Sequence, residues 1–162
     1  MLTVSPARLP DDLEAVRALF AEYAEWTGVD LSFQDFGREL ASLPGDYVPP
    51  RGALLLARLD GAKVGCVAMR PLAAGVCEMK RLYLRDAARG HGAGRALVTA
   101  IVETARAAGY QRMRLDTLPM MTAAIALYRA CGFREIEPYR FNPVPGTLYF
   151  ELGLSPSVKE PS

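Results

Sequence analysis

The hydrophobic positions along the chain repeat with two periods, and the changes of period divide it into helices and strands. Leu13, Val16 and Phe20 recur at helical spacing behind Asp11 or Asp12, either of which can cap the helix. The same period predicts three further helices, over residues 33–43, 92–108 and 119–132.

Strand-like segments fill the intervals between these helices. They cover residues 2–5, 53–59, 63–69, 76–84, 112–116 and 147–152. Asp60-Gly61 is a strong hairpin signal between the second and third of them, and the fourth continues an antiparallel sheet. The expected order is strand, two helices, three strands, helix, strand, helix and two strands, and no bounds are assigned to the first of the last two strands. This order predicts an α/β (α+β) fold.

Length and composition predict one domain. A chain of 162 residues can bury a full core, and we place the domain at residues 1–154, with a polar, disordered tail at 155–162. The net charge of +1 argues against a nucleic-acid partner. No apolar run is long enough to span a membrane and no signal peptide begins the chain, so we expect no membrane partner and a cytoplasmic location.

Cysteine and histidine usage narrows the chemistry. Cys66, Cys77 and Cys131 are odd in number, lack metal-ligand spacing and are interpreted as reduced thiols. His91 is the only histidine, which excludes histidine-based metal sites and Ser-His-Asp machinery elsewhere. No metal site is expected.

The segment from Arg89 to Gly94, Arg-Gly-His-Gly-Ala-Gly, is the clearest chemical signal. It lies between a predicted strand and a predicted helix, and its glycines let backbone N–H groups approach a ligand. The helix N-terminus favours an anion, and an arginine adds positive charge, so a phosphorylated ligand is expected. Arg95 stands where the dinucleotide fingerprint needs its third glycine, and no Gly-Lys-Ser/Thr triplet exists for a P-loop.

This segment has the form Arg/Gln-x-x-Gly-x-Gly/Ala and resembles the pyrophosphate loop of the GCN5-related N-acetyltransferase (GNAT) superfamily. Two further landmarks support the resemblance: four residues separate Leu84 from the loop, and residues 127–133 read Leu-Tyr-x-x-x-Gly-Phe. The resemblance spans about residues 2–152. It implies a mixed, mostly antiparallel sheet of six to seven strands with about four helices, in which the fourth and fifth strands splay apart.

The resemblance also implies acetyl-CoA as cosubstrate and assigns residues to it. The backbone of Leu82 and Leu84 would pair with the pantetheine arm, and Met121 stands where many relatives carry an asparagine that contacts the cofactor. The pyrophosphate would be held by the loop and the following residue, which are Arg89, Gly90, His91, Gly92, Ala93, Gly94 and Arg95.

Two residues are candidates for acid–base catalysis. Glu78 occupies the position where many members of the family carry their general base, and a carboxylate there could take the proton of an ammonium. The alternative is a strand glutamate paired to Lys80 or to a surface arginine. Tyr128 matches the family's general acid, which protonates the departing thiolate; the alternative is a core aromatic. Alternation sends Cys77 to the opposite face of the strand from Glu78, which disfavours an acyl-cysteine.

The acceptor pocket is expected from segments that the glycine loop does not explain. Its predicted residues are Tyr23, Trp26, Phe33 and Phe36 near the first two helices, Tyr139, Arg140, Phe141, Asn142 and Pro143 before the last strand, and Arg81 between them. Arg81 or Arg140 could hold an acceptor carboxylate, which predicts a small amine with an anionic group. Alternatively, the aromatics cover the sheet edge and the arginines are solvated.

The favoured function is therefore acetyl-CoA-dependent N-acetylation of a primary amine of a small molecule, by direct attack in a ternary complex. Two alternatives stay open: a non-catalytic acyl-CoA-binding or sensing module, and a protein N-terminal acetyltransferase. A homodimer is the family's common habit.

Overall fold

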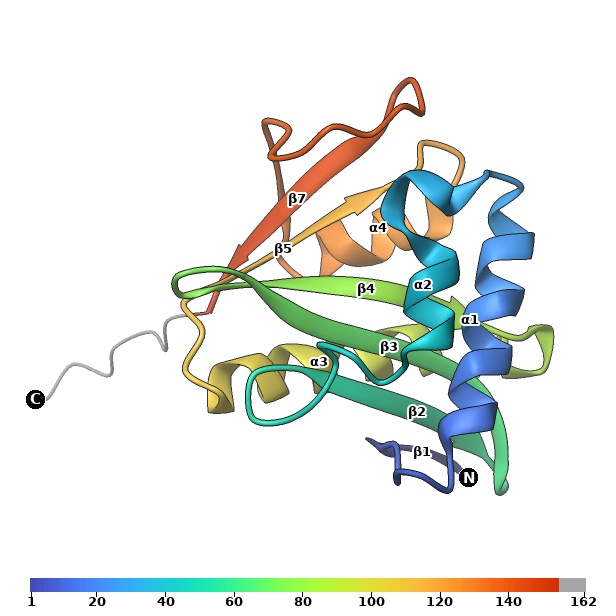
Figure 1. Ribbon diagram of the computed structural model, residues 1–162. Coiled ribbons are helices and arrows are strands. Elements are labelled where there is room, and N and C mark those ends of the chain that lie inside the picture. Colours follow the sequence, from blue (N-terminus) through green and yellow to red (C-terminus); the bar gives the residue numbers. More distant parts are fainter. Residues whose placement is uncertain (155–162) are drawn as a thin grey trace, which may run out of the picture.

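A seven-stranded sheet organises the chain in the computed structural model, which describes residues 1–154 apart from the side chain of Phe33 (Figure 1). The predicted disordered tail at 155–162 lies outside the described residues. The strand order is β1-β2-β3-β4-β5-β7-β6, and every neighbouring pair is antiparallel except β4 and β5. The predicted mixed, mostly antiparallel sheet is confirmed.

The element bounds follow the predicted order closely. The strands are β1 (Leu2–Pro6), β2 (Ala53–Leu59), β3 (Ala62–Ala73), β4 (Val76–Leu84), β5 (Arg112–Thr117), β6 (Arg134–Ile136) and β7 (Leu148–Gly153). The helices are α1 (Leu13–Thr27), α2 (Phe36–Ala41), α3 (Ala93–Ala107) and α4 (Thr122–Ala130), with short 3₁₀ turns η1 (Leu31–Gln34) and η2 (Asp86–Ala88).

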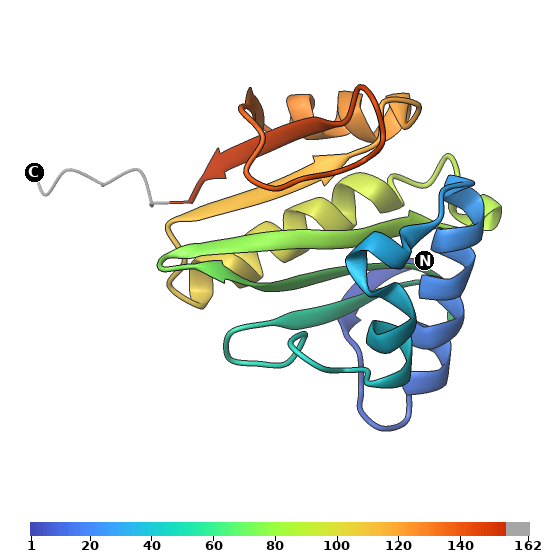
Figure 2. The ribbon, with the colours of Figure 1, turned by 45° about the horizontal axis from the view of Figure 1, so that its top comes forward.

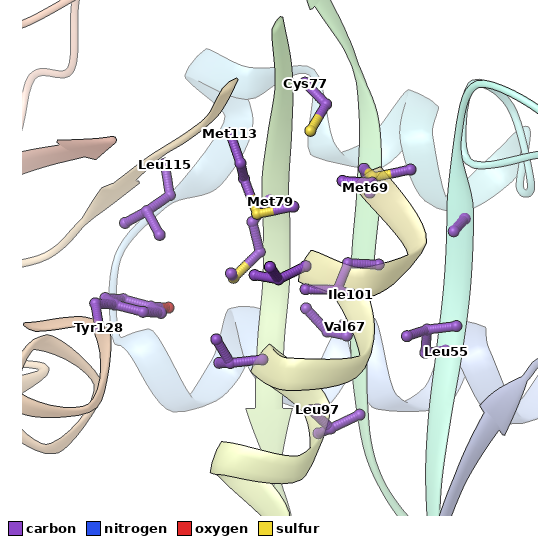
Figure 3. Packing of buried hydrophobic residues seen from close by; sticks show 14 of the residues in the cluster. Leu55, Val67, Met69, Cys77, Met79, Leu97, Ile101, Met113, Leu115 and Tyr128 are labelled. Carbon is purple, nitrogen blue, oxygen red and sulfur yellow. The ribbon is translucent and has the colours of Figure 1, made fainter. Parts of the chain in front are cut away.

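The sheet has helices on both faces, α1 and α2 on one and α3 and α4 on the other (Figures 1 and 2). Alternation along β2 and β3 therefore buries both sets of side chains. Leu56 and Cys66 join Phe20 of α1, whereas Leu55 and Val67 join the residues of α3 on the opposite face. Figure 3 shows the second of these two cores, with Ile101 and Leu97 of α3 against the strands.

Two helix boundaries differ from the prediction. The segment 33–43 is divided, because Asp35 adopts a left-handed conformation (φ 57°) between η1 and α2. The last helix begins at Thr122 rather than at Pro119, after a turn. Hydrophobic spacing alone does not register either interruption, because the apolar residues on both sides still face the sheet.

The pairing of β4 with β5 is short, and this opens the sheet. Pairing runs from Val76 with Arg112 to Glu78 with Arg114 and then stops, although β4 continues to Leu84 and β5 to Thr117. The predicted splay of the fourth and fifth strands is thus confirmed. Beyond it, β4 keeps its partner β3 on the other side, so its backbone groups facing β5 are open to a ligand.

A bulge in β4 determines what the opening presents. Lys80 pairs with Ala68 and Tyr83 with Cys66, so two residues of β4 stand opposite Val67. Arg81 is one of the two and adopts φ 62°. Because the bulge interrupts the alternation, the consecutive side chains of Lys80 and Arg81 lie on one face, the face of α1 and α2.

Within residues 1–154, none of the helices is long and apolar enough to cross a membrane.

Candidate active site

The opening between β4 and β5 is a narrow cavity in the middle of the sheet. It is lined from both strands, from α1, from η1 and from α4. The lining residues are Tyr23, Trp26, Gln34, Met79, Lys80, Arg81, Leu82, Leu115, Asp116, Thr117, Met121, Ala124 and Tyr128. Six of these were predicted as site residues from the sequence: Tyr23, Trp26, Arg81, Leu82, Met121 and Tyr128.

Tyr128 reaches this cavity from α4. Its side chain is 6% exposed, and its ring packs on Phe133 and Phe150 while the hydroxyl points toward β4 (Figure 3). Burial raises the pKa of the phenol, and Tyr23 and Asp116 raise it further. In the described chain its hydroxyl makes no hydrogen bond, so the proton is available to a ligand. The ring of Tyr128 is therefore part of the core and its oxygen faces the opening, and its role as general acid stays a prediction.

The glycine loop turns the chain from η2 into α3. Gly90 and Gly92 have φ of 80° and 72°, which side chains other than glycine rarely adopt. The first helical hydrogen bond of α3 runs from Ala96 N–H to Gly92 O at 3.0 Å. The N–H groups of the residues between them have no helical carbonyl to reach and face outward at the positive helix end.

The other residues of the loop differ in solvent exposure and in the space around them. Arg89, His91 and Arg95 are exposed, and the single contact of Arg89 is an exposed ion pair with Asp86 at 3.1 Å, which is weak. Gly94 is confined, because a Cβ there would lie 3.2 Å from a methyl group of Leu127. Its glycine lets α3 approach α4 and β4, so it has a packing function besides any ligand contact.

Sequence reasoning missed three polar residues of the cavity, Lys80, Gln34 and Asp116. Lys80 is 5% exposed, and its ammonium donates to Gln34 Oε1 at 3.1 Å; Arg81 Nη1 donates to the same oxygen at 2.8 Å. Burial lowers the pKa of Lys80 to about 8, helped by the Arg81 charge. The signal that could have found Lys80 and Asp116 was their place on the two splaying strands.

Asp116 is the carboxylate that lines the cavity. It is half-buried on β5, on the same face of the sheet as Lys80, and Asn142 Nδ2 lies 3.3 Å from its Oδ2. The contact with Asn142 ties the segment before β7 to the cavity. The predicted acceptor residue Asn142 therefore contacts the site through Asp116, which sequence reasoning missed.

Glu78 lies on β4 outside the cavity lining and is fully buried. Its carboxylate accepts from Arg70 Nε at 3.1 Å, Tyr139 Oη at 2.6 Å and Arg140 Nη2 at 2.8 Å. Burial opposes its charge, but Lys80, the Tyr139 hydrogen bond and the two arginines outweigh burial, so the pKa of Glu78 lies below its ordinary value. It joins the segment before β7 to β3 and β4. Whether it also accepts a proton stays a prediction.

Arg81 is committed to a partner within the chain. Its side chain is 1% exposed, Nε and Nη2 bind the two oxygens of Glu39 at 2.9 Å each, and its guanidinium lies 5.0 Å from the Phe36 ring centre. Arg140 is engaged with Glu78. Arg140 binds through Nη2 only, and its buried Nε has no hydrogen-bond partner in the described chain, so of the two predicted arginines only Arg81 has its guanidinium fully occupied.

The remaining predicted acceptor residues are divided between the cavity and its surroundings. The ring centre of Trp26 lies 5.8 Å from that of Tyr83 and the side chain is half exposed, while Tyr139 stacks edge-on against Tyr149 beside Glu78. The backbone of Phe33 belongs to η1, next to Gln34. Phe141 is 79% exposed and touches neither cluster of polar residues.

Comparison with known proteins identifies the family of the chain. The chain belongs to the acetyltransferase (GNAT) family, whose model matches residues 13–133. It is 42% identical over 156 residues to an uncharacterized N-acetyltransferase of Schizosaccharomyces pombe, covering 95% of this chain and 96% of that one. The chain is therefore an N-acetyltransferase, and the family resemblance stated from the motifs is confirmed.

Solved structures support the same fold. A GNAT-family acetyltransferase from Staphylococcus aureus superposes with a TM-score of 0.78 at 17% identity, covering 96% of this chain and 100% of that chain. A Salmonella typhimurium protein solved with acetyl-CoA gives 0.69 at 19% identity, covering 95% and 94%. At these identities the likeness concerns the fold.

Gly92 allows the pyrophosphate site to be tested with two variants of similar shape and different charge. Both Asp and Asn tolerate the left-handed conformation, and a Cβ there meets no atom within 4 Å. Gly92→Asp should weaken CoA binding about ten- to a hundred-fold, because a carboxylate beside the pyrophosphate is repelled by ~1–4 kcal/mol. Gly92→Asn, of equal shape, should bind nearly as wild type. Calorimetry measures both affinities; equal CoA affinity for the two variants would remove the pyrophosphate from this loop.

The pairing of Arg81 predicts a loss of stability. Glu39→Ala leaves a buried guanidinium without its carboxylate and should lower the free energy of unfolding by about 3–5 kcal/mol. The double variant Glu39→Ala with Arg81→Leu removes both charges and should recover part of the loss. Chemical denaturation measures this, and a single variant as stable as wild type would show that Arg81 does not depend on Glu39.

Proposed function

We propose that this N-acetyltransferase transfers an acetyl group from acetyl-CoA to a primary amine of a small molecule, by direct attack in a ternary complex. The observation that carries the proposal is the cavity at the splay, where a phenol, a carboxylate and the unpaired edge of β4 meet. The GNAT family uses acetyl-CoA, and the two ends of the proposed cofactor path are chemically suited to it.

The cofactor path begins at the glycine loop and ends at Tyr128. The outward N–H groups at the start of α3 suit the pyrophosphate, with Arg89 and Arg95 beside it. The pantetheine amides would pair with the β4 backbone near Leu82 and Leu84, where β5 has left its edge free. Met121 lines the cavity at the start of α4, where it offers the pantetheine an apolar contact in place of a polar one.

The chemistry follows from the groups at the end of this path. The acceptor, an ammonium at neutral pH, first gives up one proton. The neutral nitrogen then attacks the thioester carbon, the carbon–sulfur bond breaks, a second proton leaves the nitrogen and the sulfur gains one, so one proton in all is released to solvent. We assign the proton gained by sulfur to Tyr128. Burial raises the pKa of the phenol, which opposes donation, but the same burial disfavours a free thiolate, so the two effects offset one another as charge develops on sulfur.

For the proton leaving the amine we assign Asp116 rather than Glu78. Asp116 lines the cavity, whereas Glu78 does not. The Glu78 carboxylate already accepts hydrogen bonds from Arg70, Tyr139 and Arg140. A carboxylate held by three donors is a weak base. In this proposal Glu78 is a positioning residue that fixes Arg70, Tyr139 and Arg140 around the acceptor.

The two alternative functions are weighed by the same cavity. A sensing module needs no phenol directed at the thioester and no carboxylate opposite it. A protein N-terminus would have to enter between α1, η1 and the segment before β7, where Trp26 and Gln34 narrow the cavity. A cytoplasmic location is part of the proposal, since Cys66, Cys77 and Cys131 are free thiols. A homodimer is proposed on family habit alone.

Tyr128→Phe tests the acid. It removes one hydroxyl and keeps the ring that packs on Phe133 and Phe150, so folding and CoA affinity should be preserved. The kcat should fall about ten- to a thousand-fold, the range of a positioned proton donor. Steady-state rates with a good amine acceptor measure it; an unchanged kcat, with the chemical step rate-limiting, would leave Tyr128 a packing residue.

A pair of isosteric variants separates the two carboxylates. Asp116→Asn should lower kcat/KM about a hundred-fold or more at pH 7 and much less near pH 9–10, where more of the amine, with a pKa of ~10.4, is already neutral. Glu78→Gln should lower activity by a factor that does not vary with pH. The reverse pattern in the pH–rate profiles would restore Glu78 as the general base.

A further inference from the structure

A second hollow lies beside the active-site cavity, between α2, the loop that follows it and β3. Its volume is about 400 Å³, within the range of small-molecule sites. It is lined by Gln34, Asp35, Arg38, Glu39, Ser42, Leu43, Pro44, Gly45, Asp46, Tyr47 and Arg70. Gln34 also lines the active-site cavity, so the two spaces are neighbours across one side chain.

Tyr47 contributes an unexplained hydrogen-bonding group to this hollow. The residue is 3% exposed, and its hydroxyl is buried without a hydrogen-bond partner in the described chain. Buried hydroxyls are nearly always paired, so this one calls for a ligand or a water. Burial raises the pKa of Tyr47 far above neutrality, and the hydroxyl is therefore a donor.

Arg70 supplies the charge. Its Nε is bound to Glu78, but its two terminal nitrogens donate no hydrogen bond within residues 1–154, and the side chain is 27% exposed. Arg70 and Tyr47 both line the hollow. A guanidinium fork with an adjacent hydroxyl donor is suited to a carboxylate.

The other charges of the hollow limit what the anion can be. Glu39 is neutralised by Arg81, and Arg38 stands exposed on the rim. Asp35 and Asp46 are exposed rim carboxylates, which oppose a doubly charged group such as phosphate. The balance favours a single negative charge placed deep, at Arg70 and Tyr47.

We propose that this hollow is the specificity site for the acceptor, and that it binds a carboxylate through Arg70 and Tyr47 while the amine of the same molecule passes Gln34 into the cavity. The inference rests on the proposed function for the amine half. In place of Arg81 and Arg140, which do not line the hollow, Arg70 and Tyr47 recognise the anion. The acceptor class is thus an aminocarboxylic acid.

The test compares amines that differ only in a carboxylate: lysine with cadaverine, 4-aminobutyrate with propylamine, and β-alanine with ethylamine. Thiol release gives kcat/KM for each. Wild type should prefer the carboxylate member of at least one pair about ten-fold or more. Tyr47→Phe and Arg70→Lys should raise the KM of the carboxylate substrate, so that the ratio of the two kcat/KM values falls toward one. Tyr47→Phe should leave the kcat/KM of the carboxylate-free amine unchanged.

A matched control is Tyr110→Phe, which removes another phenol hydroxyl, one that donates to the Arg51 carbonyl at 2.7 Å and belongs to a residue that does not line the hollow. It should leave the preference unchanged. Calorimetric titration of the same carboxylates into the CoA complex measures binding without turnover. Turnover of amines with no carboxylate preference would overturn this inference alone. If carboxylates bind and Tyr47→Phe weakens that binding, but no amine is turned over, the proposed function is wrong and the specificity site stands. If the carboxylates do not bind and are not preferred as substrates, the proposed specificity site is wrong.

Discussion

The early end of the β4–β5 pairing is the constraint on which the rest of the site depends. Three residue pairs hold the strands together at Val76, Cys77 and Glu78, and beyond them the strands diverge. A parallel pair that continued to Leu84 would satisfy the β4 edge with β5 backbone and would close the cavity. The divergence instead leaves backbone groups and side chains of both strands facing one space, which Tyr128 closes from α4.

The bulge at Arg81 then assigns charges to that space. Regular alternation would direct Lys80 and Arg81 to opposite faces of the sheet, and one of them would enter the apolar layer against α3. With the bulge, Lys80 and Arg81 both lie on the face covered by α1 and α2, and both donate to the Gln34 oxygen. Glu39 and Glu78 balance the cations there. The face of α1 and α2 is therefore a network of paired charges. Within residues 1–154 its unsatisfied buried atoms are the Tyr47 hydroxyl and Arg140 Nε, and the terminal nitrogens of Arg70 donate no hydrogen bond.

The sequence predicted the backbone of this site better than its side-chain partners. The hydrophobic period, Asp60-Gly61 and the glycine loop were sufficient for the order of the elements, the β2–β3 hairpin and the start of α3, because each is a local property of neighbouring residues. The splay of β4 and β5 was implied only by the family resemblance. Lys80, Gln34 and Asp116 were missed because they become a set only when β5 and η1 meet β4. Arg81 and Arg140 were expected to contact the acceptor, but a sequence does not show that Glu39 and Glu78 reach them first.

Thiol reactivity follows from the way the three cysteines are distributed. Cys66 and Cys77 are buried in the sheet, and burial raises the pKa of each to about 12, so neither presents a thiolate near neutral pH. Cys131 ends α4 and is partly exposed. A disulfide reagent used to follow CoA release will therefore also titrate Cys131, three residues beyond Tyr128. The same thiol offers a single attachment point for a fluorophore that senses occupancy of the cofactor path.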